Sequence, residues 1–259
     1  MDLAAFGISK IQIFLLVLTR TAGIFTLTPT FGSNHIPANV RIAMAVGLAL
    51  IFLPMVNAPA QMPGDIPNMA LMICREAMIG LIIGFVCTMV FSTIESAGHL
   101  VDSQSGFGFA SMVDPGSGNN GTVASRFQNL LAMLLFFATN AHHVMIRGLA
   151  DSFTIAPIGQ VDLNPALAGG AITIFTSLFV VAVRIAAPLL AALFLADLAL
   201  AMLSKLVPQM NVFIVGLPFK LGLALVGLLI TLPFNAVISH QLFGDTYRYI
   251  GDLVGLTLH

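Results

Sequence analysis

Long apolar stretches without a single charge constrain the fold of this chain more than any other feature. They lie at 21–40, 42–64, 77–94, 127–146, 163–183 and 221–244, with a shorter one at 185–196. A helix that crosses the ~30 Å hydrocarbon core of a bilayer needs about 20 apolar residues, and several stretches reach that length. Only 8% of the residues are charged, against about 25% in soluble domains. We therefore expect an all-α membrane protein, which excludes soluble enzyme folds and disordered chains.

The length of the chain bounds its organisation. At 1.5 Å per helical residue, 259 residues supply about 390 Å of helix, enough for roughly six membrane spans with their connections. No separate soluble domain fits beside them, so 1–259 is predicted to be a single domain. The net charge of -1 provides no basic surface for a nucleic acid.

The interiors of the apolar stretches carry helix breakers. Prolines stand within or beside several of them, among them Pro54, Pro188, Pro218 and Pro233. Charges bracket the C-terminal stretches closely, at Arg184, Asp197 and Lys220. Proline removes a backbone donor, and charge at membrane depth is tolerated where protein or a water-filled cavity surrounds it. We expect broken or hairpinned helices whose surface is covered in part by partner subunits.

Gly80 and Gly84 lie one helical turn apart. Together with Ala77 they form a small-residue face that lets another helix approach closely, although glycine is also frequent in apolar helices in general.

The motifs that suggest catalysis or cofactor binding lack the neighbouring residues that such sites require. The segment 116–121, Gly-Ser-Gly-Asn-Asn-Gly, matches the dinucleotide pattern letter by letter, but Asp114-Pro115 precedes it and the next acidic residue is Asp151. A dinucleotide site needs a preceding buried strand and an acidic residue about twenty positions on. The adjacent His142 and His143 do not have metal-ligand spacing. The prediction is a protein that is not an enzyme and uses no cofactor or metal.

A polar stripe runs along one predicted helix. Thr88, Ser92, Glu95, His99 and Asp102 follow in steps of four, three, four and three, which places them on one helix face. This face either lines an aqueous conduit or meets a partner, or it is simply the solvated side of a helix that leaves the apolar layer. A proton relay is a further alternative, because carboxylate and imidazole at one-turn spacing can exchange protons.

The segment from Gln104 to Gly121 combines glycines with apolar side chains. Phe107, Phe109, Met112 and Val113 alternate with glycines where a solvent loop would carry polar residues. Such a segment either tucks into the core of its own chain or fills a cavity formed with neighbours.

Short motifs in a fixed order resemble the FliR family, the export-gate component of bacterial flagellar type III secretion, which has homologues in injectisomes. The resemblance spans nearly the whole chain. Its residues are Arg20, Gly23, Pro29, Phe31, Ile36-Pro37 and Arg41; Gly98, Asp102, Gln104, Gly106, Phe109 and Asp114-Pro115; Asp151-Ser152-Phe153 and Pro157-Ile158-Gly159; and Pro208, Gln209, Met210, Asn211, Val212, Phe213, Gly216, Pro218 and Lys220.

The resemblance implies a subunit that completes a helical ring of FliP and FliQ homologues in the bacterial inner membrane at the flagellar basal body. It also implies contact with FlhB and FlhA homologues, with membrane lipid and with unfolded export substrates. In this family the segment matching 104–120 is understood as a plug of the closed channel. The plug residues expected here are Gly106, Phe107, Gly108, Phe109, Met112 and Val113.

A secondary transporter is the alternative to an export subunit. It would use Glu95, His99 and Asp102 for proton coupling, and it should show an internal repeat of interrupted helices. No convincing repeat is present in the sequence.

Overall fold

The computed structural model describes residues 3–32, 36–56, 63, 65–108, 122–160, 165–209 and 211–258. Within these ranges every regular element is helical. The predicted plug residues Phe109, Met112 and Val113 lie outside the described residues, as does the glycine-rich segment 116–121.

Among the described residues, five helices are long and apolar enough to cross a membrane. They are α1 (Leu3–Leu27), α3 (Ala38–Phe52, continued by the 3-10 turn Leu53–Met55), α4 (Ile66–Ser105), α8 (Ala166–Leu206) and α9 (Val212–Gly255). A sixth, broken span is formed if α6 (Val123–Ala138) and α7 (Ala141–Ile155) count as one. The short elements are α2 (Pro29–Gly32) and the 3-10 turn Leu256–Leu258. The chain is thus an all-α membrane protein, as the apolar stretches predict.

Prolines do not end the two C-terminal helices. Pro188 lies inside α8, and Pro218 and Pro233 lie inside α9. Each helix continues on both sides of its prolines, so α8 and α9 follow the hairpinned alternative of the prediction, and the broken helix is the pair α6 and α7. Proline within a membrane helix is tolerated where neighbouring groups satisfy the carbonyl that it leaves without a donor. Pro54, in contrast, stands in the 3-10 turn that ends α3.

Contacts divide the chain into two compact units, each assembled from distant parts of the sequence. The first contains 1–90, 140–175 and 243–259, and the second contains 91–139 and 176–242. Helices α4, α8 and α9 contribute residues to both units.

In the first unit, α1 and α4 approach each other through glycines. A Cβ atom on Gly23 would lie 2.7 Å from the backbone carbon of Gly80, and one on Gly84 would lie 3.2 Å from the Gly23 carbonyl oxygen. Real Cβ atoms essentially never come within 3.0 Å of another heavy atom, so a side chain at Gly23 would overlap α4, and a Cβ at Gly84 would need its neighbours to shift. The prediction that Gly80 and Gly84 admit a neighbouring helix is confirmed.

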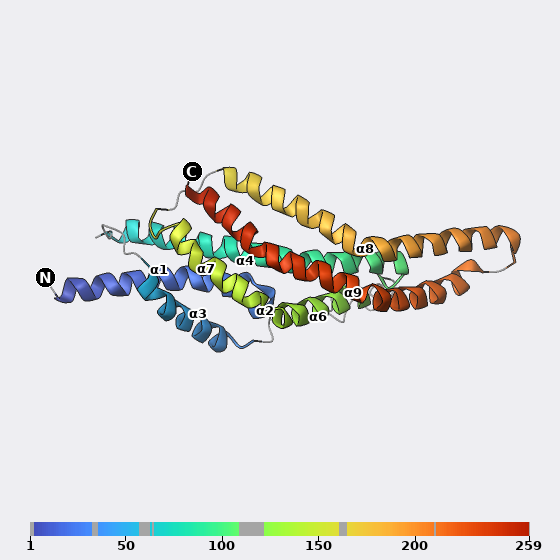
Figure 1. The fold of residues 1–259 in the computed structure, drawn as a ribbon, viewed down its shortest axis with the longest axis horizontal. Helices are drawn as coiled ribbons and strands as arrows, with labels where there is room; N and C mark the ends of the chain where they lie inside the picture. The colour runs from blue at the N-terminus through green and yellow to red at the C-terminus, as the bar shows by residue number, and fades with distance from the viewer. Residues whose placement is uncertain are drawn as a thin grey trace. The chain divides into compact units, whose positions relative to one another are not determined.

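In the second unit, α8 and α9 form a helical hairpin (Figure 1). A side chain on Gly227 of α9 would overlap Leu189 of α8, so these helices also meet through a glycine. In the same unit, Phe91 of α4 packs against Phe136 of α6, with ring centroids 5.2 Å apart.

Candidate functional site

A fully buried ion pair forms the polar centre of the first unit. Arg20 of α1 donates from Nε to Oε2 of Glu76 at 2.7 Å, and its Nη2 lies 2.6 Å from the same oxygen. Both side chains are 0% exposed. Charge-assisted bonds of this kind are strong, and burial of either ion without its partner is costly. Glu76 is not part of any sequence prediction, although an acidic residue beside a long apolar stretch is itself a signal of a buried partner.

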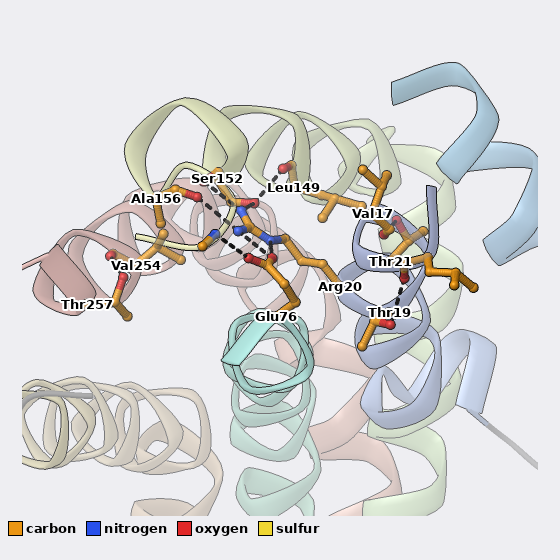
Figure 2. A network of polar contacts seen from close by, with 12 residues as sticks. Val17, Thr19, Arg20, Thr21, Glu76, Leu149, Ser152, Ala156, Val254 and Thr257 are labelled. Carbon is orange, nitrogen blue, oxygen red and sulfur yellow. Dashed lines mark hydrogen bonds and ion pairs between the residues drawn. The ribbon is translucent and has the colours of Figure 1, made fainter. Parts of the chain in front are cut away.

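The same guanidinium caps the end of α7. Nη1 donates to the carbonyl oxygen of Ser152 at 2.9 Å, and Nη2 donates to that of Ala156 at 2.9 Å. The Ser152 carbonyl already accepts the Ala156 N–H at 2.9 Å, so Arg20 is its second donor, whereas the Ala156 carbonyl lies past the last residue of α7. The C-terminal end of a helix carries partial negative charge, which favours a cation. Figure 2 shows Arg20 enclosed by Glu76 from α4 and by Ser152 and Ala156. The Phe153 ring lies 4.4 Å from the guanidinium carbon.

Glu76 also fixes the turn that follows α7. Its Oε1 accepts the backbone N–H of Gly159 at 3.2 Å. Gly159 has a φ of +82°, which favours glycine. The motif residues around 152 and 157–159 therefore lie together with Arg20 although more than 130 positions separate them along the chain. The network therefore joins α1, α4 and α7 to one another.

The C-terminal end of α4 carries a different polar group, in the second unit. Asp102 is buried, and its carboxylate accepts the backbone N–H groups of Ala124 and Ser125, each at 2.8 Å, and the hydroxyl of Thr122. These donors form the first turn of α6, so Asp102 supplies the cap that this helix lacks from its own sequence. A Cβ on Gly98, one turn earlier, would overlap the Ser125 backbone.

Glu95 and His99, the other titratable residues of the stripe, are more exposed than Asp102. Glu95 accepts a bond from Asn129 Nδ2 at 3.1 Å, and His99 Nε2 lies 3.8 Å from Glu95 Oε1. The side chains of His99 and Glu95 are 48% and 38% exposed. The structure thus separates the predicted stripe into a buried capping residue, Asp102, and an accessible pair.

Asp197 of α8 gathers two partners in the second unit. Lys220 of α9 approaches its two carboxylate oxygens at 2.8 Å and 3.1 Å, and Gln104 of α4 donates from Nε2 at 2.9 Å. A cavity of about 410 Å³ adjoins this cluster. Its lining includes Ser103 to Gly106 of α4, Leu200 of α8 and Phe213 of α9. Gln104 and Lys220 belong to the family motif, whereas their meeting at Asp197 is not predicted by the sequence.

The predicted plug begins directly beside this cavity. Gly106 has a φ of +95° and donates its N–H to the Asp102 carbonyl at 3.3 Å, which ends α4. Phe107 donates its N–H to Ser105 Oγ at 3.5 Å. Phe107 and Gly108 are half-buried.

The remaining family-motif residues lie at the connection between α8 and α9. Asn211 Oδ1 accepts the N–H groups of Phe213 at 3.1 Å and Ile214 at 3.4 Å, which is the N-cap geometry that asparagine favours. Pro208 and Gln209 form the exposed turn before it. Phe213 is 64% exposed.

Metal-binding clusters are absent from the described part of the chain, where no three His, Cys, Asp or Glu side chains gather. His142 and His143 lie within it, with ring centroids 4.2 Å apart.

Large apolar side chains cover the outside of α8 and α9. Only 33% of the apolar window in α8 and 17% of that in α9 is buried within the chain. Their exposed members include Phe175, Phe179, Phe194, Leu195, Met202, Leu206, Phe213, Ile214, Leu229 and Ile230. A surface of this composition requires lipid or protein around it.

The fold and these surfaces define an α-helical integral membrane protein whose polar groups hold helices together. A family model described as bacterial export proteins, family 1, matches residues 11–246, so the chain belongs to this family of export proteins. The predicted resemblance is confirmed.

Individual relatives are similar in sequence to this chain over most of their length. The flagellar biosynthetic protein FliR of Bacillus subtilis (strain 168) is 33% identical over 246 residues, which cover 94% of this chain and 95% of the relative. FliR of Escherichia coli (strain K12) is 26% identical over 95% of this chain and 94% of the relative. Yop proteins translocation protein T of Yersinia pestis is 30% identical over 88% of this chain and 87% of the relative.

Proposed function

We propose that this chain is a subunit of a flagellar type III export gate and forms part of the channel through which unfolded flagellar proteins leave the cytoplasm. The observation that carries the proposal is the apolar surface of α8 and α9, most of which the chain leaves uncovered. Family membership supplies the export role, and the FliR relatives favour the flagellar system over the injectisome. The proposal assigns the chain no catalytic step.

The partners proposed are FliP and FliQ homologues around the apolar faces, with FlhB and FlhA homologues nearby. The place proposed is the bacterial inner membrane at the flagellar basal body. Exposed phenylalanines and leucines on this hairpin need apolar cover, which the helices of partner subunits can supply.

The plug proposed is the segment Gly106, Phe107, Gly108, Phe109, Met112 and Val113. A channel wide enough for an unfolded chain leaks ions at rest unless an apolar constriction excludes water. The turn at Gly106 supports this role, because its positive φ directs the chain out of α4 at the start of the segment. Each large apolar side chain that becomes fully buried contributes about 1.5–3 kcal/mol to closure.

Proton coupling by the polar stripe is the second candidate function. The accessible contact between His99 and Glu95 favours it. Asp102 argues against it, since three donors of the α6 N-terminus already occupy its carboxylate.

The test is ion conductance through the complex reconstituted with its FliP and FliQ homologues. Deletion of 107–113, or replacement of Phe109 and Met112 by Ala, should raise conductance while the complex still assembles. A control variant, Phe175→Ala, truncates an exposed phenylalanine of α8 outside the segment. Unchanged conductance after the deletion would remove the plug from the proposal and favour a segment packed against its own chain.

A further inference from the structure

Arg184 is a single charge near the middle of the apolar outer face of α8. Its side chain is exposed. Val180, one turn before it, and Leu195, three turns after it, lie on the same face of the helix and are 52% and 64% exposed. Arg184 forms no ion pair and no side-chain hydrogen bond with any residue that the structure describes.

Helix α8 itself contains no counter-ion for Arg184. Its charged residues are Arg184, Asp197 and Lys205. Asp197 lies about 20 Å further along the helix axis, at 1.5 Å per residue. Its carboxylate is already paired with Lys220 at 2.8 Å. The one acidic residue of α8 is thus both distant from Arg184 and neutralised by another cation.

The facing arm of the hairpin, α9, contains none at this level either. A side chain on Gly227 would overlap Leu189, which fixes the register of the two antiparallel arms. Arg184 lies five residues before Leu189, so it is level with residue 232, five residues after Gly227. From 221 to 244 the sequence of α9 has no Asp, Glu, Lys or Arg. The counter-ion of Arg184 must therefore come from outside the hairpin.

The length of α8 indicates that protein covers part of this face. A helix of 41 residues is about 60 Å long, and even at a tilt of about 40° it extends some 47 Å along the bilayer normal. The hydrocarbon core is only about 30 Å thick. If Arg184 lies within this core, an unpaired charge is costly there. If it lies outside, the exposed apolar side chains around it need cover by protein.

We propose that Arg184 forms an ion pair with a carboxylate on an apolar helix of a partner subunit, packed along the outer face of α8. The inference rests on the export-gate role proposed above and adds the chemistry of the contact. A guanidinium pairs with a carboxylate through two parallel hydrogen bonds. An Asp or Glu on an otherwise apolar helix has the same need for a counter-ion, so the pair neutralises both charges in one interface.

Dissociation of the complex with FliP and FliQ homologues tests the pair. Arg184→Gln removes the charge and keeps a polar side chain. The fluorescently labelled chain should leave the complex at least about thirtyfold faster, the effect of removing one partner of a buried ion pair. The control Lys205→Gln removes a cation from the last turn of the same helix and should change the rate by no more than about fivefold. A wild-type rate for Arg184→Gln would overturn the proposal.

Charge exchange identifies the partner carboxylate. Arg184→Glu should weaken the complex more than Arg184→Gln, because two carboxylates then face each other. Each Asp and Glu in the apolar helices of the FliP and FliQ homologues is replaced in turn by Arg in this background. One replacement should restore the slow dissociation of the wild type, and such a rescue also shows that the Arg184→Glu chain is folded. If none restores it, the ion pair is refuted.

A lipid phosphate is the alternative counter-ion. Dissociation is therefore measured in detergent after removal of lipid and in vesicles that contain phosphatidylglycerol. A partner carboxylate predicts faster dissociation of Arg184→Gln in both, whereas an effect confined to the vesicles would assign Arg184 to lipid and overturn the proposal. If the wild-type chain forms no complex with these homologues, the proposed function itself fails. If the complex forms and Arg184→Gln dissociates no faster, the function stands and only the ion pair is refuted.

Discussion

Removal of either charge at the centre of the first unit should cause a large loss of stability. In Glu76→Gln the guanidinium of Arg20 stays fully buried without its counter-ion, and in Arg20→Met the carboxylate of Glu76 does. Breaking a buried pair in this way costs about 3–5 kcal/mol. For a chain of this size that corresponds to a fall in melting temperature on the order of 10 °C.

The double variant Arg20→Met/Glu76→Met should recover only part of this loss. It removes both buried charges, so the penalty for an unpaired ion disappears. The Ala156 carbonyl and the Gly159 N–H still lose their side-chain partners, and the Ser152 carbonyl keeps only the Ala156 N–H. Each polar group left unsatisfied in the interior costs about 1–3 kcal/mol. The double variant should thus be less damaged than the sum of the singles, yet remain below the wild type.

The two cysteines provide the assay. Cys87 is buried and Cys74 is exposed, so a Cys74→Ser background leaves one thiol that a fluorogenic thiol reagent reaches on unfolding. Melting curves are measured on the complex with partner subunits that lack cysteine. Single variants that melt within about 2 °C of this background would refute the reasoning, because a buried pair with these contacts cannot lose a charge at so small a cost.

Three further variants test the second unit and its polar stripe. Asp102→Ala should lower stability by about 1–2 kcal/mol in the same melting assay, because α6 loses its cap; an unchanged melting temperature would contradict the capping role. Gly98→Leu should prevent close packing on the Ser125 backbone and cost at least the ~1–3 kcal/mol of an overpacked core, whereas a wild-type melting curve would mean that the helices can move apart freely. Glu95→Gln should leave export of flagellar substrates largely intact, since the amide oxygen still accepts from Asn129; near-complete loss of export with normal assembly would favour proton coupling.

The helices were predictable because their signal is local. Apolar runs of membrane length need no information from the rest of the chain, and they account for α3, α4, α8 and α9. The stretch 21–40 is the exception, because it covers only the end of α1, the short α2 and the start of α3. The prolines left open whether α8 and α9 are broken or hairpinned, because the effect of proline on a membrane helix depends on its neighbours.

The polar contacts were predictable only in part, since they join residues far apart in sequence. Arg20 meets Glu76 across 56 positions, and Gln104 meets Asp197 across 93. The motif identifies Arg20 and Gln104, yet the partner of each is fixed by the packing of helices and not by any local pattern. Asp102 illustrates the same limit: its spacing places it on a stripe with Glu95 and His99, while its burial and its bonds to α6 follow from tertiary structure.

Co-purification of the co-expressed proteins tests the central claim most directly. The chain should be produced with and without FliP and FliQ homologues, and its detergent-soluble, monodisperse fraction and the composition of that fraction measured. The apolar surface of α8 and α9 predicts a poor yield alone and a stable complex with fixed stoichiometry when the partners are present. Equal yields of a well-behaved, partner-free chain under both conditions would contradict the proposed role as a subunit of an export gate.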